Sequence, residues 1–183
     1  MINLKNIIVL FRELRINTFE KGEIMIHTGS TNKDLFFVRK GLVRSYIVDD
    51  KADEITFQLF PEQRTFGNIS AILFNEGSRF TFQALEKTKV YKIDYESFQI
   101  LTAKNIQLLE LNRMFLGKQI VKQAFQRIES FVLLSPEDRY KKFVKEYPDL
   151  NNRVPDKYIA NILGITPVSL SRIRSRIATK KQS

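Results

Sequence analysis

The chain has no cysteine, no tryptophan and a single histidine among its 183 residues. The absence of cysteine excludes disulfide bonds, thiolate zinc sites and cysteine-ligated iron–sulfur clusters, and agrees with a reducing cytoplasm. His27 alone cannot build a catalytic triad or a protein-only metal cage, so we expect no metal site and interpret it as an ordinary strand or turn residue. Fifteen phenylalanines indicate a core that depends on phenylalanine.

The sequence also lacks the signatures of an enzyme and of a membrane protein. It has no glycine-rich phosphate loop, and no nucleophile, base and oxyanion site can be assembled from it. The acidic pairs Asp49-Asp50 and Asp53-Glu54 flank a lysine and are interpreted as a solvated turn. The N-terminal segment MINLKNIIVLFREL is amphipathic, has no cleavage site and is too short to span a bilayer. We therefore expect a soluble cytoplasmic protein that is not an enzyme.

Positive charge is concentrated towards the C-terminus. The net charge is +10, and residues 135–183 contribute eleven basic and five acidic side chains to it. From Lys157 onward there are six Lys or Arg and no Asp or Glu. A basic end of this kind favours nucleic acid or an anionic membrane surface as a partner.

The hydrophobic period changes twice along the chain. Residues 2–15 have helical spacing, residues 17–94 read as many short strands typical of a barrel or sandwich, and the helical period returns at Tyr95. Residues 68–74 are predicted to form a short helix within the strand region, and residues 95–103 another after it. Residues 106–134 are predicted to form one long helix.

This long helix is apolar on two sides, so both sides need to be buried. One stripe comprises Ile106, Leu109, Leu116, Ile120, Ala124 and Phe131, and the other Leu111, Met114, Val121, Phe125, Ile128 and Val132. One stripe can pack on the barrel. The other would pack on a second copy of the chain, which gives a homodimer, or on another element of the same chain.

The last fifty residues carry clear signals for helix ends. Ser135 and Pro136 suit the start of a helix that ends before Pro148, and a domain boundary is expected near residues 133–136. A second helix is expected to open at Pro155 and Asp156 and to end at Gly164, where a positive φ is allowed. Thr166 then caps a third helix.

The third helix has an inner apolar face of Leu170, Ile173 and Ile177 and an outer polar face. Placed in a major groove, such a helix presents Arg172 to the two acceptors of guanine and Val168 to a thymine methyl. Thr166, Ser171, Arg174 and Arg176 suit phosphates. The predicted DNA-contacting residues are Thr166, Pro167, Val168, Ser169, Ser171, Arg172, Arg174, Ser175 and Arg176. The alternative is a small helical cap with a solvated basic face.

Four segments, KGEIMIHTG, LFFVRKGLVRSY, FGNISAILF and YIANILGITPVSLSRIR, together resemble the Crp/Fnr superfamily of bacterial transcription regulators, most closely its short branch common in Bacteroidetes-type bacteria. Gly22, Gly29 and Gly41 correspond to its turn positions. The resemblance implies an α+β fold: a double-stranded β-helix of the jelly-roll, cyclic-nucleotide-binding type with a dimerisation helix (1–134), and an all-α helix-turn-helix domain with at most a minimal wing (135–183).

The resemblance also implies an effector site, with differences from the family pattern. Nucleotide-binding members place a glutamate after the cassette glycine and an arginine six residues before an alanine. Here Asn68 follows Gly67, Ser78 stands six residues before Ala84, and the arginine is Arg79. The candidate effector-binding residues are Gly67, Asn68, Ser70, Arg79, Phe80 and Thr81. We expect a ligand other than cyclic AMP, or a vestigial cavity.

The resulting hypothesis is a homodimeric, sequence-specific regulator that binds double-stranded DNA under the control of an unidentified effector, and that contacts RNA polymerase if it activates. The alternative is a small-molecule-binding module whose helical tail contacts protein.

Overall fold

The computed structural model describes residues 13–103, 106, 109–110, 117 and 120–180. Its contacts divide the chain into two compact units. The first comprises Met1–Ile47 with Gln58–Lys122, and the second comprises Val48–Phe57 with Gln123–Ser183. The tip of one β-hairpin therefore belongs with the C-terminal helices, a grouping that the sequence did not suggest. The predicted domain division at residue 134 stays a prediction.

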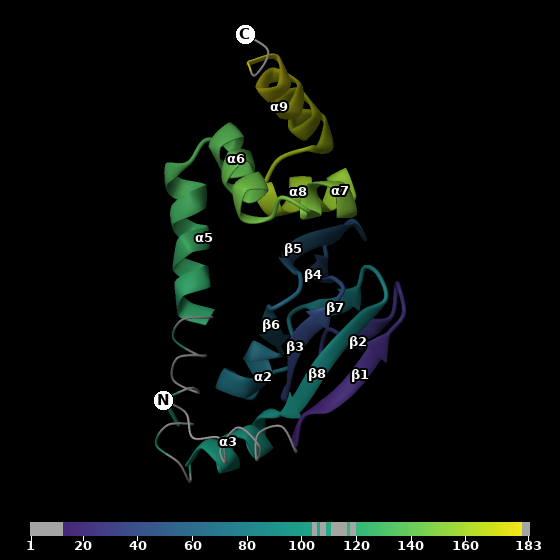
Figure 1. Cartoon of the computed structure of the whole chain (residues 1–183), viewed down its shortest axis with the longest axis vertical. Coiled ribbons are helices and arrows are strands. Elements are labelled where there is room, and N and C mark those ends of the chain that lie inside the picture. Colours follow the sequence, from purple (N-terminus) through teal and green to yellow (C-terminus); the bar gives the residue numbers. More distant parts are fainter. Residues whose placement is uncertain (1–12, 104–105, 107–108, 111–116, 118–119, 181–183) are drawn as a thin grey trace. The chain divides into compact units, whose positions relative to one another are not determined.

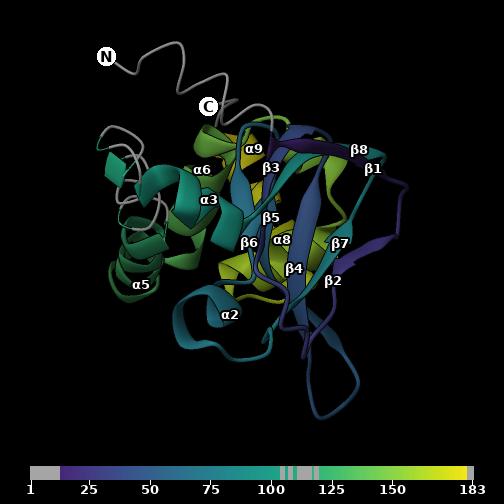
Figure 2. The same ribbon diagram turned by 90° about the horizontal axis from the view of Figure 1, so that it is seen from below.

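The strands form two four-stranded sheets, as the strand-rich region predicted (Figure 1, Figure 2). The sheets have the orders β1-β8-β3-β6 and β2-β7-β4-β5, and pairs such as β3–β8 are antiparallel. This arrangement is the expected β-roll. The strands are β1 (Arg15–Phe19), β2 (Ile24–Ile26), β3 (Asp34–Lys40), β4 (Val43–Val48), β5 (Glu54–Phe60), β6 (Thr65–Gly67), β7 (Thr81–Ala84) and β8 (Thr88–Asp94).

Phenylalanine rings fill the space between the two sheets. Phe66 stacks on Phe36 with ring centroids 5.0 Å apart and on Phe82 at 5.4 Å, and Phe60 lies 5.3 Å from Phe66. All four rings are buried, together with Ile26, Val38, Val43 and Val90. Aromatic pairs at these separations add to the stabilisation from area burial, so the core depends on phenylalanine as its abundance predicted.

Strand β4 departs from the simple alternation of its sequence, because its outward-facing residues are buried too. Arg44 is only 2% exposed. Its guanidinium donates twice to Gln83 Oε1, from Nε at 2.9 Å and Nη2 at 2.6 Å, and lies over the Tyr46 ring at 4.1 Å. Strand β7 alternates between buried and half-buried residues as expected.

The helices of the first unit agree with the sequence where they are described. Helix α2 (Ile69–Phe74) and helix α3 (Tyr95–Ala103) lie where they were predicted. Of the helix predicted over residues 2–15, residues 1–12 lie outside the described residues, and Arg15 belongs to strand β1 instead. Strand β1 pairs with β8 in the sheet, which explains why Arg15 is extended.

The second unit contains five helices among the described residues: α5 (Lys122–Leu133), α6 (Pro136–Glu146), α7 (Leu150–Arg153), α8 (Asp156–Leu163) and α9 (Pro167–Lys180). Ser135 caps α6 by accepting from Asp138 N–H, as predicted. The short α7 was missed, because four residues are too few for a periodic pattern. Residues 120–180 contain no strand, in agreement with the expectation of little room for a wing.

A substitution at the Gly41 turn would test how tightly the backbone packs there. Gly41 has φ +108°, and a Cβ there would lie 2.7 Å from Thr88 Cα and 2.9 Å from Lys87 O. We expect Gly41→Ala to lower the free energy of unfolding by about 1–3 kcal/mol through backbone strain and by about 1–3 kcal/mol more through overpacking. Urea denaturation followed by circular dichroism measures this loss. Gly22→Ala is the control, since φ is +90° there and no atom lies within 4 Å of the added Cβ. An equal loss in both variants would show that the close packing at Gly41 is unimportant.

Candidate nucleic-acid interface

Helices α8 and α9 form a helix-turn-helix with the ends that the sequence predicted. Gly164 ends α8 in the left-handed conformation, with φ 64° and ψ 40°, and Ile165 N–H donates to Ala160 O at 3.0 Å. Thr166 Oγ1 accepts from Ser169 N–H at 3.1 Å and so caps α9. These two caps fix where each helix stops and starts, so the angle of the turn is set locally.

One face of α9 is held against α8 by apolar contacts. Leu170 is fully buried and Ile173 is 2% exposed, while Ile177 is half-buried. Ile159, Ala160 and Leu163 of α8 are buried as well. Burial of the inner face leaves the opposite face of α9 turned to solvent, as the periodicity predicted.

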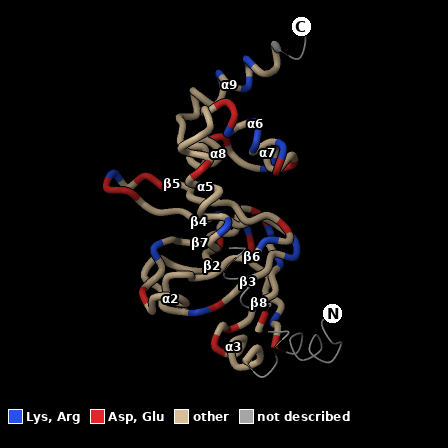
Figure 3. The backbone as a smooth tube through the Cα atoms, turned by 90° about the vertical axis from the view of Figure 1, so that its left-hand side faces the viewer, with Lys and Arg blue, Asp and Glu red and all other residues tan. Residues whose placement is uncertain are grey.

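The exposed face of α9 is basic and contains no acidic residue (Figure 3). Val168 is 60% exposed, and Arg172, one turn later, is also exposed. No carboxylate among the described residues pairs with Arg172, whereas Arg176 lies 3.7 Å from Glu137 Oε2. Ser175 Oγ donates to Ser171 O at 3.1 Å, so this hydroxyl is partly satisfied by its own helix. Of the remaining predicted contacts, Thr166, Pro167 and Ser171 are exposed and Ser169 is half-buried.

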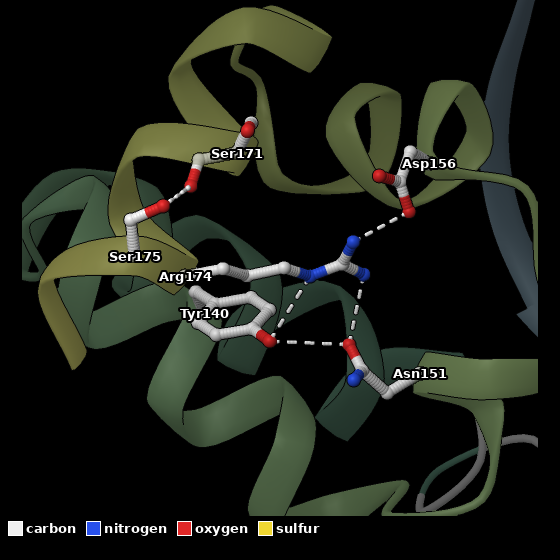
Figure 4. A network of polar contacts seen from close by, with 6 residues as sticks. All are labelled: Tyr140, Asn151, Asp156, Ser171, Arg174 and Ser175. Carbon is white, nitrogen blue, oxygen red and sulfur yellow. Dashed lines mark hydrogen bonds and ion pairs between the residues drawn. The ribbon is translucent and has the colours of Figure 1, made fainter. Parts of the chain in front are cut away.

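Arg174 lies in a different environment from the other basic residues of α9 (Figure 4). Its guanidinium donates to Asp156 Oδ1 at 2.6 Å, to Asn151 Oδ1 at 2.9 Å and to the Tyr140 hydroxyl at 3.2 Å. Partial burial alone would lower the pKa of Arg174, but the hydrogen bonds to Asp156 and Tyr140 raise the pKa above its ordinary value. Arg174 thus ties α9 to α6, α7 and α8. Its predicted phosphate contact stays a prediction, and would require these bonds to be given up.

A second cluster, the Phe131 cluster, joins α5 and α6 to the turn. Arg139 lies 4.8 Å from the Phe131 ring centroid and donates to Leu163 O at 3.0 Å and Leu134 O at 2.8 Å. The centroid of the same ring is 5.3 Å from Arg127. These roles could not be predicted from the sequence, because neither arginine is part of a recognisable motif.

The hairpin tip between β4 and β5 packs within this second unit. Arg127 lies 4.2 Å above the Phe57 ring and donates to Phe57 O at 2.7 Å, and burial lowers the pKa of this arginine. Thr56 N–H donates to Asn161 Oδ1 at 3.1 Å. The turn itself is held by Asp49, which accepts from two backbone N–H groups, so its acidic residues form the solvated turn that was predicted.

Helix α5 and the residue just before it, Val121, expose much of the second apolar stripe. Val121 is 50%, Phe125 61%, Ile128 60% and Val132 74% exposed. Leu111, Met114 and Leu116 lie outside the described residues. Within the described part, several large apolar side chains of this stripe therefore face solvent, as the dimer hypothesis requires.

Asn68, among the candidate effector residues, is committed to structure. It is 1% exposed, its Nδ2 donates to Ser30 O at 2.6 Å and Asn32 O at 3.1 Å, and its Oδ1 caps α2 by accepting from Ala71 N–H at 3.2 Å. All of its polar side-chain atoms are therefore engaged within the protein.

The other candidate effector residues lie in different environments. Arg79 is exposed, Phe80 packs against the phenylalanine core, and Thr81 Oγ1 lies 2.9 Å from Thr28 Oγ1. Ser70 is half-buried, and Gly67 approaches Asp34 O so closely that a Cβ would lie 2.7 Å away. Their role as a ligand site stays a prediction. No group of three or more His, Asp or Glu suited to a metal ion occurs among the described residues.

Comparison with known proteins agrees with this architecture. Residues 16–105 match the model for the cyclic nucleotide-binding domain. The fumarate and nitrate reduction regulatory protein of Salmonella typhi is 28% identical over 177 residues, covering 88% of this chain and 68% of that protein. The structure of FixK2 from Bradyrhizobium japonicum is similar with a TM-score of 0.77 at 17% identity, over 92% of this chain and 86% of that one. A Crp/Fnr-family regulator from Eubacterium rectale gives 0.70 at 20% identity, over 98% and 85%.

A β-roll followed by a helix-turn-helix defines a class of sensor-regulated DNA-binding proteins. In sequence and fold the chain is similar to the Crp/Fnr transcription regulators. The fold and the resemblance predicted from the four sequence segments are therefore confirmed. In the described part of the chain, no helix combines the length and the apolar character needed to cross a bilayer.

The Arg174 network predicts a structural effect that a solvated arginine would not have. We expect Arg174→Ala to lower the free energy of unfolding by about 1–3 kcal/mol, because charge-assisted hydrogen bonds are lost and their acceptors are left unpaired. Hydrogen exchange should quicken at α9 amides. Arg172→Ala is the matched control on the same helix and should leave stability unchanged. Equal stability of the two variants would contradict the positioning role of Arg174.

Proposed function

We propose that the protein is a homodimeric regulator that binds specific sites in double-stranded DNA through α9. The observation that carries this proposal is the outer face of α9, where Val168, Arg172 and Arg176 stand exposed on a helix whose inner face is buried. An α-helix with one exposed basic face fits the width of a major groove.

The exposed residues divide into two roles. Arg172 donates to the O6 and N7 acceptors of guanine, and Val168 one turn earlier contacts a thymine methyl. Arg176, Thr166 and Ser171 contact phosphates, which hold the helix in register without reading the sequence. Arg174 has a positioning role in this proposal, because its guanidinium already has three partners within the protein.

The exposed apolar stripe of α5 supplies the dimer contact. A two-fold symmetric pair would place two α9 helices in half-sites about 34 Å apart, one turn of DNA. The β-roll would act on the long 106–134 helices by favouring one of two arrangements. We also propose that the protein is cytoplasmic. If it activates transcription, it contacts RNA polymerase. Nothing in the described residues supports catalysis as an additional role.

The α9 arginines provide a direct test of base reading against phosphate contact. Arg172→Ala should weaken binding to the selected operator by about 1–3 kcal/mol and relax the preference at one base pair. Arg176→Ala should weaken binding to all duplexes and reduce the slope of log K against log salt by about one. Titrations of operator and random duplexes at several salt concentrations measure both effects.

The control for these variants is Lys21→Ala, which removes one exposed positive charge from the first unit. It should leave affinity and slope unchanged. A genomic selection that yields no preferred duplex would defeat the proposal, and a flat salt response would favour the alternative in which the helical tail contacts protein.

Cyclic AMP should not stabilise the protein. Both polar atoms of the Asn68 side chain are already hydrogen-bonded within the protein, so this residue has none left to hold a ribose hydroxyl. We expect millimolar cyclic AMP to leave the melting temperature unchanged, whereas a ligand at a hundred times its Kd would add about 2.7 kcal/mol. Calorimetry with cyclic AMP measures this, and a clear upward shift would show that the β-roll keeps a nucleotide site.

A further inference from the structure

The outer face of the sheet β1-β8-β3-β6 carries an open apolar row. Ile16, Tyr91 and Phe37 are register partners on three adjacent strands, so their side chains point to the same side. Ile16 is 60% and Phe37 37% exposed, and the rings of Phe37 and Tyr91 lie 6.4 Å apart. The neighbouring row, Leu35 and Ile93, is buried against residues of α3. Helix α3 therefore covers the row of Leu35 and Ile93 but leaves the row of Ile16, Tyr91 and Phe37 open.

Three cations stand beside this apolar row. Lys40 and Lys89 are register partners, and Arg39 lies 5.8 Å over the Tyr91 ring. All three are exposed, and no carboxylate in the described part of the chain forms an ion pair with them. Ile16, Phe37, Tyr91, Arg39, Lys40 and Lys89 together are called the β8 face below.

The positive charges of the β8 face repel one another and so destabilise the sheet. Like charges directly opposite each other on paired strands destabilise a sheet. Lysine on an edge strand is a common protection against aggregation. Strand β8 lies between β1 and β3, so this explanation does not apply to Lys89, whereas Lys40 lies beyond the residues of β3 that pair with β6. A bound anion would offset the repulsion between Lys40 and Lys89.

We propose that the β8 face binds an acidic, extended segment of a partner protein. Its carboxylates pair with Arg39, Lys40 and Lys89, and its alternate apolar side chains cover Ile16 and Phe37. Charge complementarity argues against the chain's own residues 1–12 as the occupant, since these include Lys5 and Arg12 and no acid. Stacked nucleobases fit less well, because Arg39 already lies over Tyr91 and Ile16 offers no aromatic surface. Exposed ion pairs are individually weak, so the contact is a weak docking contact.

The full chain offers a clean probe because it has no cysteine. Thr18→Cys, at the register partner of Lys89, carries an environment-sensitive fluorophore as the only label. The labelled protein is titrated with a short peptide of alternating Glu and Leu, and separately with a Lys–Leu peptide and a single-stranded oligo(dT). Arg172→Ala and Arg176→Ala in the background remove α9 as a competing site. DNA binding plays no part in the readout, so this test is independent of the proposed function.

The Glu–Leu peptide is expected to bind and the Lys–Leu peptide is not. K40E/K89E should weaken binding about tenfold through charge repulsion, and K40Q/K89Q, which avoids placing two carboxylates opposite each other, should weaken it less. Ile16→Ser should also weaken it. The control K21E/K51E changes the net charge equally at exposed lysines outside this face and should have no effect. Equal losses in both Glu variants, no binding of the Glu–Leu peptide, or oligo(dT) binding with the same dependence on Lys40 and Lys89 would overturn the proposal.

Discussion

The contact between Phe131 and the turn at Gly164 is the constraint on which the second unit depends. A Cβ at residue 164 would lie 2.6 Å from Phe131 Cε1, so glycine is required there by space as well as by its φ of +64°. The ring is flanked by Arg127 and Arg139, and Arg139 also binds Leu163 O at the end of α8. Helix α9 begins three residues after Gly164. Its direction with respect to α5 is therefore fixed by one aromatic ring and the cations around it.

The basic residues of this unit divide sharply between holding the structure and facing solvent. Arg127, Arg139 and Arg174 donate to backbone or side-chain oxygens inside the unit. Arg172 and Arg176 remain exposed. The charge available to a polyanion is thus smaller than the net charge of the segment suggests. What remains is concentrated on one helix face, where it can act over the short distances that contact requires.

The sequence predicted best what depends on local chemistry. The caps at Ser135 and Thr166, the turn glycine and the inner face of α9 are all set by residues within one or two turns of each other. The burial of Arg44 could not be predicted, because it depends on Gln83, which lies distant in the chain and adjacent in the sheet. The internal role of Arg174 was missed for the same reason. The helical period places Arg174 beside the outer face of α9. Only the tertiary contacts show that Asn151 and Tyr140 accept hydrogen bonds from it.

The hairpin tip shows a further limit of pattern reading. Residues 48–57 read as ordinary strand ends and a polar turn, and they do form these. Their contacts with α5 and α8 include the Arg127 guanidinium at the Phe57 ring and carbonyl, the hydrogen bond from Thr56 to Asn161 and the ion pair of Asp53 with Lys157. Contacts of this kind cannot be recognised from composition or hydrophobic period. Domain limits predicted from sequence therefore divide the chain into consecutive segments, although packing can group segments that are not consecutive.

The contacts of Asn68 make position 68 unfavourable for the glutamate that nucleotide-binding members carry there. Its amide group supplies donors to Ser30 O and Asn32 O and an acceptor to Ala71 N–H, at a site that is almost completely buried. A carboxylate at this position would keep the cap on α2 but would face two carbonyl oxygens with no proton to offer either. A change to glutamate alone would therefore replace two attractive contacts by repulsion at a buried site. A carboxylate at position 68 would therefore require a matching change in the loop at residues 30–32, so these two segments, which are distant in the sequence, are coupled through one side chain.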